Sequence, residues 1–313
     1  NSSVDVASLR GAKLQATVVN TFAVTARDRF GNLQPSGAPD FRGAVTGTAF
    51  VSAVIDKQTS ATGVNIGRFT PTRKGSYQLS VTLLGEPVQG SPASFTVAAG
   101  PTNLTASVFT GQGLSTAVVG VHTSFSLTAR DLGGTDRPEP QLYLSGNETA
   151  DTVVVRVNNS LHSSNNAWCI YVVADSRHAC GYTVTIAGTY TMSITLTTPG
   201  GTADFYTQSR VFSVTALPSE IDARSSTASG PAFSNGTVGM PARFTVIGRD
   251  VYGNRGVYDA LKPVVYNIKI ANAVTYPEYT IADNKDGSYT YTFVPTLAGA
   301  YRIDVEYSKS GIS

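Results

Sequence analysis

The stretch that decides the fold occurs three times, as Phe22-Ala-Val-Thr-Ala-Arg-Asp28, Phe125-Ser-Leu-Thr-Ala-Arg-Asp131 and Phe244-Thr-Val-Ile-Gly-Arg-Asp250. In each copy an aromatic residue and an aliphatic residue two places later alternate with small or polar residues, which is typical of a strand with one buried face. Glycines and asparagines follow the Arg-Asp pair and allow the chain to turn. The sequence therefore predicts a strand and a turn, repeated three times.

A second block follows each copy. It reads Phe69-Thr-Pro71 with Gly75-Ser-Tyr77, Tyr182-Thr-Val184 with Gly188-Thr-Tyr190, and Phe293-Val-Pro295 with Gly299-Ala-Tyr301. Each tyrosine begins a stretch in which apolar and polar residues alternate, so one face of this strand packs and the other meets water. A closing strand follows in the first two copies only, at Ser94–Val97 and Val211–Val214.

Many short strands with turn signals, and no convincing amphipathic helix, predict an all-β chain of antiparallel β-sandwiches. The repetition divides the 313 residues into three domains. We call residues 1–98, 99–216 and 217–313 the first, second and third repeats. Each linker between them contains a proline and no long Gly/Ser run, which favours a semi-rigid rod.

These residues resemble the filamin-type immunoglobulin-like repeat. The resemblance rests on Phe244 to Asp250 with Tyr252-Gly253-Asn254, on Asp286-Gly287-Ser288-Tyr289, and on Phe293-Val-Pro295 with Gly299-Ala-Tyr301. It covers nearly the whole chain and implies three tandem immunoglobulin-like sandwiches. The second repeat departs from the pattern, with a longer middle region from about Thr135 to Trp168.

The third repeat reaches Ser313 without the closing strand that the resemblance implies. A sandwich without this strand exposes backbone N–H and C=O groups and part of its core. We therefore expect either that the natural chain continues beyond residue 313 or that another chain supplies the strand, and we favour the first.

The charge balance disfavours polyanionic partners. Lys plus Arg is 23 and Asp plus Glu is 21, so the net charge of +2 gives no basic surface for nucleic acid or an anionic membrane. No run of apolar residues is long enough to span a bilayer, so we expect any membrane anchor to lie outside this segment.

Cys169 and Cys180 are the only cysteines and lie in two β-rich runs separated by the polar turn 174–178. This arrangement favours a disulfide that links the strands of a hairpin over a pair of free buried thiols. A zinc site that adds His162 and His178 is disfavoured, because the spacing matches no compact ligand pattern.

Five Asn-x-Ser/Thr sequons are candidates for N-glycosylation in a secreted protein. They begin at Asn1, Asn103, Asn147, Asn158 and Asn235. Several lie in turn-like contexts, and together with the cysteine pair they favour an extracellular, cell-surface location.

No residues form a recognisable catalytic or metal-binding set, so we predict no enzyme activity, no cofactor and no metal. The histidines are His122, His162 and His178, and none lies in a catalytic or metal-binding motif. Asp283–Gly287 resembles a calcium loop but lacks the downstream glutamate, and a hairpin turn explains it better. Asp28, Asp131 and Asp250 are expected to accept backbone hydrogen bonds in their turns.

The leading functional hypothesis is an extracellular adhesion or recognition segment. Filamin-like repeats with sequons and a disulfide resemble plant and algal gamete-surface adhesion proteins, which implies a protein partner, such as a receptor, on an opposing cell. The alternative is an intracellular filamin-like scaffold that binds partner peptides by strand addition, with Gly43–Gly47 and Val264–Ile270 as candidate strands. An accessory region of a larger enzyme ranks lowest.

Overall fold

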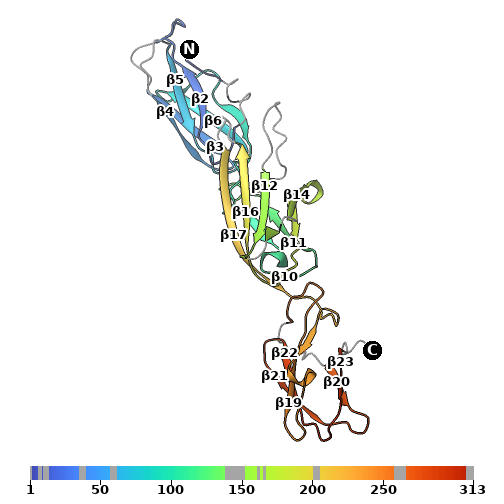
Figure 1. Ribbon diagram of the computed structural model, residues 1–313. Coiled ribbons are helices and arrows are strands. Elements are labelled where there is room, and N and C mark those ends of the chain that lie inside the picture. Colours follow the sequence, from blue (N-terminus) through green and yellow to red (C-terminus); the bar gives the residue numbers. More distant parts are fainter. Residues whose placement is uncertain are drawn as a thin grey trace.

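The structure is a computed structural model that describes residues 2–5, 9, 14–34, 40–56, 62–137, 152–160, 163–164, 167–199, 205–256 and 266–307. The three repeats follow one another along a long, narrow molecule (Figure 1). Apart from Leu9, which is helical, helix in these residues is limited to the short 3-10 turns η1 (Gln112–Leu114), η2 (Val173–Asp175) and η3 (Pro231–Phe233). The predicted all-β fold class is confirmed.

The first repeat builds its strands into one continuous sheet with the order β1-β2-β5-β4-β3-β6-β7, and β8 also pairs with β6. Because β4 pairs with both β5 and β3, it joins the two halves of the sandwich. The strands are β1 (Ser3–Val4), β2 (Asn20–Thr25), β3 (Phe41–Gly47), β4 (Val51–Asp56), β5 (Val64–Phe69), β6 (Gly75–Leu83), β7 (Glu86–Pro87) and β8 (Ala93–Val97).

The second repeat has two separate sheets, with the orders β10-β17-β16-β12-β13 and β14-β15-β11-β9. Strand β17 pairs antiparallel with β16 and parallel with β10. The strands are β9 (Val108–Thr110), β10 (Thr116–Val118), β11 (Thr123–Thr128), β12 (Thr152–Asn158), β13 (Ser163–Ser164), β14 (Trp168–Val172), β15 (Arg177–Tyr182), β16 (Gly188–Pro199) and β17 (Phe205–Leu217).

The third repeat pairs a sheet of the order β18-β19-β22-β21 with a sheet that contains β20 and β23 only, among the residues described. Its strands are β18 (Thr227–Ser229), β19 (Ala242–Ile247), β20 (Tyr266–Ala271), β21 (Tyr279–Asp283), β22 (Ser288–Phe293) and β23 (Arg302–Tyr307).

Both repeated sequence blocks have the same local structure in every repeat. Phe22, Phe125 and Phe244 are buried on β2, β11 and β19, as their alternation with polar residues predicts. In the second block the tyrosine hydroxyl donates to the carbonyl four residues earlier, at 2.8 Å for Tyr77 and Tyr190 and 3.1 Å for Tyr301. The glycine two residues before each tyrosine (Gly75, Gly188 or Gly299) has a φ between 137° and 146°, a backbone conformation that other residues rarely adopt.

In the second and third repeats, the aspartate of the Arg-Asp turn also accepts a hydrogen bond from the linker that precedes the repeat. Asp131 accepts the N–H of Gly100 at 2.9 Å, and Asp250 accepts the N–H of Ser219 at 3.0 Å. Both carboxylates are fully buried. The predicted hydrogen bonds within the turns are confirmed, because Asp131 also accepts the N–H of Thr135 and Asp250 that of Asn254. Sequence patterns could not indicate the linker bond.

The third repeat contacts the second through the same turn. The Asn254 side chain donates to the Thr185 carbonyl at 2.9 Å and accepts the Ala187 N–H at 2.8 Å. The Tyr252 ring lies where a β-carbon at Gly120 would be, so glycine is needed there. These contacts hold the second and third repeats end to end.

Gly248 allows β20 to carry a tyrosine in the core. It replaces Ala26 and Ala129 of the other copies, and a β-carbon at this position would collide with the Tyr266 hydroxyl. That hydroxyl is buried and makes no hydrogen bond to any described residue. Burial raises the pKa of Tyr266 to about 12.

The linker bond yields a first prediction. Asp250→Ala should destabilise the third repeat by about 1–3 kcal/mol, because buried N–H groups lose their acceptor, and should loosen its junction with the second repeat. Calorimetry measures the stability, and small-angle scattering measures the spread of interdomain geometries. Asp28→Ala is the matched control, since Asp28 accepts N–H groups in its own turn only, among the described contacts. Identical scattering of the Asp250→Ala and parent proteins would contradict the prediction.

The same junction should respond to acid. Burial acts to raise the pKa of Asp250, but hydrogen bonds from Asn254 and from backbone N–H groups outweigh it and lower the pKa. A lowered pKa stabilises the folded state above the unfolded value of about 3.9, and this contribution is lost as the pH falls through the folded value. The scattering of the parent protein should therefore approach that of Asp250→Ala only when the pH falls through the lowered pKa of Asp250, below the usual aspartate value of about 3.9.

A second prediction concerns Gly248. Gly248→Ala should destabilise the third repeat by about 1–3 kcal/mol through the collision with Tyr266, whereas Tyr266→Phe should be neutral or stabilising, since it removes an unpaired buried hydroxyl. The double variant should recover most of the loss, because the remaining neighbour is the flexible end of Ile221. Calorimetric melting of the four proteins tests this, and a double variant no more stable than Gly248→Ala would refute it.

Candidate protein-binding site

The outer edge of β20 is the clearest candidate for binding a partner strand. β20 pairs antiparallel with β23 from Tyr266↔Tyr307 to Ala271↔Arg302. No strand pairs with its other side within the described part of the chain. An unpaired strand edge presents a row of N–H and C=O groups that can pair with another chain. This strand contains the described part, from Tyr266 on, of the predicted segment Val264–Ile270.

The other predicted strand, Gly43–Gly47, does not have this free edge. It lies in β3, which pairs with β6 on one side and with β4 on the other, at Gly43↔Ala53 and Val45↔Val51. The prediction of strand addition at Gly43–Gly47 is therefore wrong over residues 43–45, because β4 already occupies that edge. In the second repeat, the equivalent strand β12 pairs with β16 and, at Val157 and Asn158 only, with β13.

The two faces of the β20–β23 sheet differ sharply. Tyr266, Ile268 and Ile270 are buried against the core, whereas Asn267 and Lys269 are exposed between them. On β23, Arg302 pairs with Asp304 at 2.8 Å, and Asn267 donates to Glu306 across the strands at 3.4 Å. Burial of these three side chains fixes the register of β20 against β23. The strand that carries the candidate edge is therefore firmly packed on one face and polar on the other.

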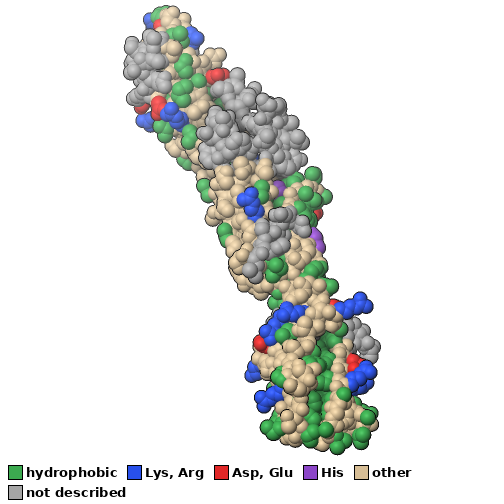
Figure 2. Space-filling model, in the orientation of Figure 1, with side chains coloured by type: hydrophobic (Ala, Val, Ile, Leu, Met, Phe, Trp, Pro, Cys, Tyr) green, Lys and Arg blue, Asp and Glu red, His purple; other side chains and the backbone are tan. Residues whose placement is uncertain are grey.

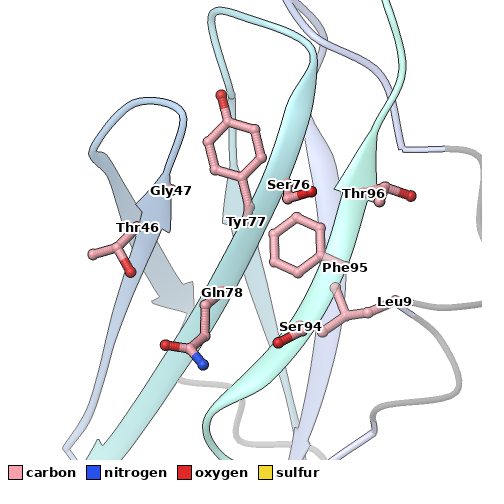
Figure 3. A pocket seen from close by; sticks show the side chains of 9 residues that line it. All are labelled: Leu9, Thr46, Gly47, Ser76, Tyr77, Gln78, Ser94, Phe95 and Thr96. Atoms are coloured by element: carbon pink, nitrogen blue, oxygen red, sulfur yellow. The ribbon is translucent and has the colours of Figure 1, made fainter.

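A cavity of about 630 Å³ lies on the first repeat. Figure 3 shows its lining side chains, which come mainly from the neighbouring strands β6 and β8 and the end of β3. They include no charged residue and no histidine or cysteine: Leu9, Thr46, Gly47, Ser76, Tyr77, Gln78, Ser94, Phe95 and Thr96. The described lining therefore offers hydroxyl and amide groups but no carboxylate, imidazole, thiol or amine.

Cys169 and Cys180 lie directly opposite each other on β14 and β15 and form a disulfide. The predicted hairpin is therefore present, although its turn is shorter than expected because η2 follows β14 and β15 begins at Arg177. His178 is buried on β15 with its ring 5.2 Å from that of Tyr171, and His122 lies 5.6 Å from Trp168. These two histidines pack against aromatic rings; His162 lies outside the described residues.

Three of the five candidate glycosylation sites can be placed. Asn235 is exposed after η3, Asn158 is exposed at the end of β12, and Asn103 is half-buried. The Asn103 side-chain oxygen accepts the N–H groups of Thr105 and Ala106, both at 3.0 Å. Asn1 and Asn147 lie outside the described residues.

The segment Asp283–Gly287 is a hairpin turn, as the sequence indicates. β21 ends at Asp283 and β22 begins at Ser288, and Asp286 pairs with Arg255 at 2.8 Å. Across the residues described, no group of three or more His, Cys, Asp or Glu side chains could hold a metal ion. The same residues include no helix long and apolar enough to cross a membrane.

Comparison with known proteins gives sequence relatives and similar structures. The chain is 28% identical over 244 residues to filamin-C of Mus musculus and of Rattus norvegicus, and each alignment covers 76% of this chain but 8% of the relative. Among solved structures, the Escherichia coli adhesin FdeC matches with a TM-score of 0.45 at 17% identity, covering 98% of this chain and 92% of that one. Invasin, a bacterial integrin-binding protein, matches with a TM-score of 0.46 at 15% identity, covering 98% and 56%.

The family match falls on the repeats whose motifs agree best. The model of the filamin/ABP280 repeat matches residues 1–94 and 220–313, which are almost the whole of the first and third repeats. The unmatched part includes the enlarged middle of the second repeat, where the sequence departs from the pattern. With more than half of its residues matched, this chain belongs to the filamin repeat family.

Proposed function

We propose that this chain is an extracellular segment of a cell–cell adhesion or recognition protein, and that it binds a partner protein through the surfaces of its immunoglobulin-like repeats. The observation that carries the binding role is the edge of β20 that no described strand pairs with, because it offers backbone hydrogen bonds to a partner strand. The division into repeats 1–98, 99–216 and 217–313 belongs to this proposal, as do a receptor on an opposing cell as partner and gamete adhesion as the setting.

The extracellular location is supported by the disulfide and by the exposed sequons. A disulfide between Cys169 and Cys180 is typical of an oxidising compartment. Asn158 and Asn235 are exposed, so an attached glycan would extend into solvent. Among the described residues, no cluster could hold a metal ion and the cavity on the first repeat has no charged lining group, which supports a binding segment rather than an enzyme.

The second candidate function is an intracellular scaffold that binds peptides by strand addition. The filamin-C similarity favours it, and the edge of β20 would serve it equally well. The two functions therefore differ in compartment rather than in binding mode.

Intact mass separates the two compartments. Protein purified from its own cell type should lose the mass of its glycans on enzymatic deglycosylation, and after reduction it should take up two additional thiol-alkylating groups, one at each cysteine. A protein with freely reactive thiols before reduction and no glycan would refute the extracellular location and favour the scaffold.

A glycan placed beside β20 tests the binding edge. Lys269→Thr completes a sequon that begins at Asn267, whose exposed side chain lies on the outer face of β20. Cells that display this variant should attach to partner cells at least several-fold less than cells that display the parent protein, because the glycan obstructs the approach to the strand edge.

The matched control is Glu278→Asn, which completes a sequon ending at Thr280, next to β21 in the opposite sheet. Mass spectrometry should establish that both new glycans are present. The control should attach as the parent does. Equal attachment by Lys269→Thr and the parent protein would exclude the β20 edge, and no attachment by the parent would exclude the adhesion role.

A further inference from the structure

The second repeat has an open recess of about 500 Å³ beside η1, β10 and the beginning of β11. Its lining residues all fall within the described stretches 62–137 and 205–256. Three of them are apolar and exposed, namely Val118 at 39%, Val121 at 53% and Leu217 at 43%. A recess of this size with an apolar part is typical of ligand-binding sites.

The polar part of the lining consists of amide, hydroxyl and imidazole groups. They belong to Gln112, His122, Thr123 and Ser124, and no Lys, Arg, Asp or Glu lines the recess. Thr116 also lines it, and the Thr116 side-chain oxygen is buried without a hydrogen-bond partner in the described part of the chain. Buried hydroxyls are normally paired, so a polar atom that enters the recess, from water or from a ligand, is expected to satisfy this one.

Two exposed rings extend the recess along the face of the sheet that is turned away from the core. Ser124, Gly181 and Trp168 lie opposite one another on β11, β15 and β14 and form one row across the sheet. The His122 ring lies over Gly181, where a β-carbon would be 2.5 Å from His122 Cε1 and 3.0 Å from Trp168 Cζ2. The two ring centroids are 5.6 Å apart. Glycine at position 181 therefore makes room for both rings.

The disulfide holds this pair of rings in place. Cys169 follows Trp168 on β14, and Cys180 precedes Gly181 on β15, so the covalent link is next to the ring pair. β14 is the last strand of its sheet among the described residues, and the link keeps it against β15. Groups that are fixed before binding lose little conformational entropy when a ligand arrives.

The same set of groups does not occur in the other repeats. When the repeats are aligned on their first sequence block, Arg243 of the third repeat takes the position of Ser124, and Pro241 takes that of His122. Trp168 is the only tryptophan of the chain. The recess with its two rings is therefore a property of the second repeat and not of the shared fold.

A sugar ring fits this combination of groups. One face of a pyranose consists of C–H groups, which pack against aromatic and aliphatic side chains, and its edge carries hydroxyls that donate and accept hydrogen bonds. An apolar peptide side chain would leave the hydroxyl of Thr116 unpaired. Charged side chains are sparse on the visible surface of the second repeat (Figure 2), and none lines the recess, so a charged ligand would find no partner of opposite sign there.

We propose that the second repeat binds a neutral glycan of at least two sugar units, with one unit against Trp168 and His122 and the next in the recess, paired with Gln112 and Thr116. The inference rests on the proposed function, because it names a class of ligand for an extracellular recognition segment. The glycan belongs either to a surface polysaccharide or to a glycoprotein. Glycan binding is measured with purified protein and adhesion with cells, so either can fail without the other.

Trp168 reports binding directly, because its fluorescence is not overlaid by that of any other tryptophan. The 313-residue protein is titrated with oligosaccharides of cellulose, mannan, xylan and galactan, with neutral N-glycans released from glycoproteins, and with oligogalacturonates. At least one neutral glycan should change the emission saturably, and binding by the first or the second group assigns the ligand to a polysaccharide or to a glycoprotein. Oligogalacturonates should bind at least about fivefold more weakly, because their carboxylates meet no cationic group.

Variants locate the site, with calorimetry as a second measurement of affinity. Ser124→Arg should abolish binding by filling the recess, and Arg243 at the equivalent position of β19 shows that the fold accepts arginine there. His122→Ala should weaken binding about three- to tenfold through the loss of one contact. The matched control is Ser209→Arg, which places the same side chain on exposed β17 and should change the affinity less than about threefold.

Circular dichroism verifies that each variant is folded, and His122→Ala decides the test if Ser124→Arg does not fold. The absence of a saturable response to every neutral glycan would overturn the proposal. Tighter binding of oligogalacturonates than of neutral glycans would also overturn it, as would unchanged binding by folded Ser124→Arg or by His122→Ala.

Discussion

The arrangement of the repeats depends on a buried carboxylate that needs N–H donors. Asp131 and Asp250 are fully buried, and an unpaired charge in such a place is costly. Each has two sources of donors: its own turn, and the linker that arrives from the preceding repeat. The linker bond is therefore part of what makes the turn stable, so the position of one repeat is coupled to the folding of the next.

The local structure could be predicted because its causes lie close together in the sequence. The alternation from Phe22 onward indicates a strand with one buried face, and the alternation that begins at Tyr77 indicates a second one. The cysteine pair could be placed on one hairpin because only a short polar segment separates Cys169 from Cys180. Short-range periodicity, turn chemistry and repetition were sufficient for these elements.

The rest depended on contacts between residues far apart in the chain. Nothing near Gly43–Gly47 indicates that β4 pairs with this strand as well as with β5, so the expectation of a free edge at this strand is wrong. The bond from Ser219 to Asp250 crosses a repeat boundary and involves a backbone N–H, which any residue except proline possesses. A sequence pattern cannot carry a signal for such a donor. For the same reason, only one of the two candidate strands for partner binding is supported by the structure. Whether a strand edge is free depends on distant strands, which the local sequence does not reveal.

The third repeat combines a well-packed interior with a strand edge, that of β20, which no other strand of the described residues pairs with. Tyr266, Ile268 and Ile270 hold β20 in register from the core side, and the hydroxyl of Tyr266 fits only because Gly248 lacks a β-carbon. A rigid strand loses little conformational entropy when a partner adds to it. The edge of β20 is flanked by the polar side chains of Asn267 and Lys269 and offers mainly backbone groups. Recognition at this edge would therefore depend more on the extended conformation of a partner than on its sequence.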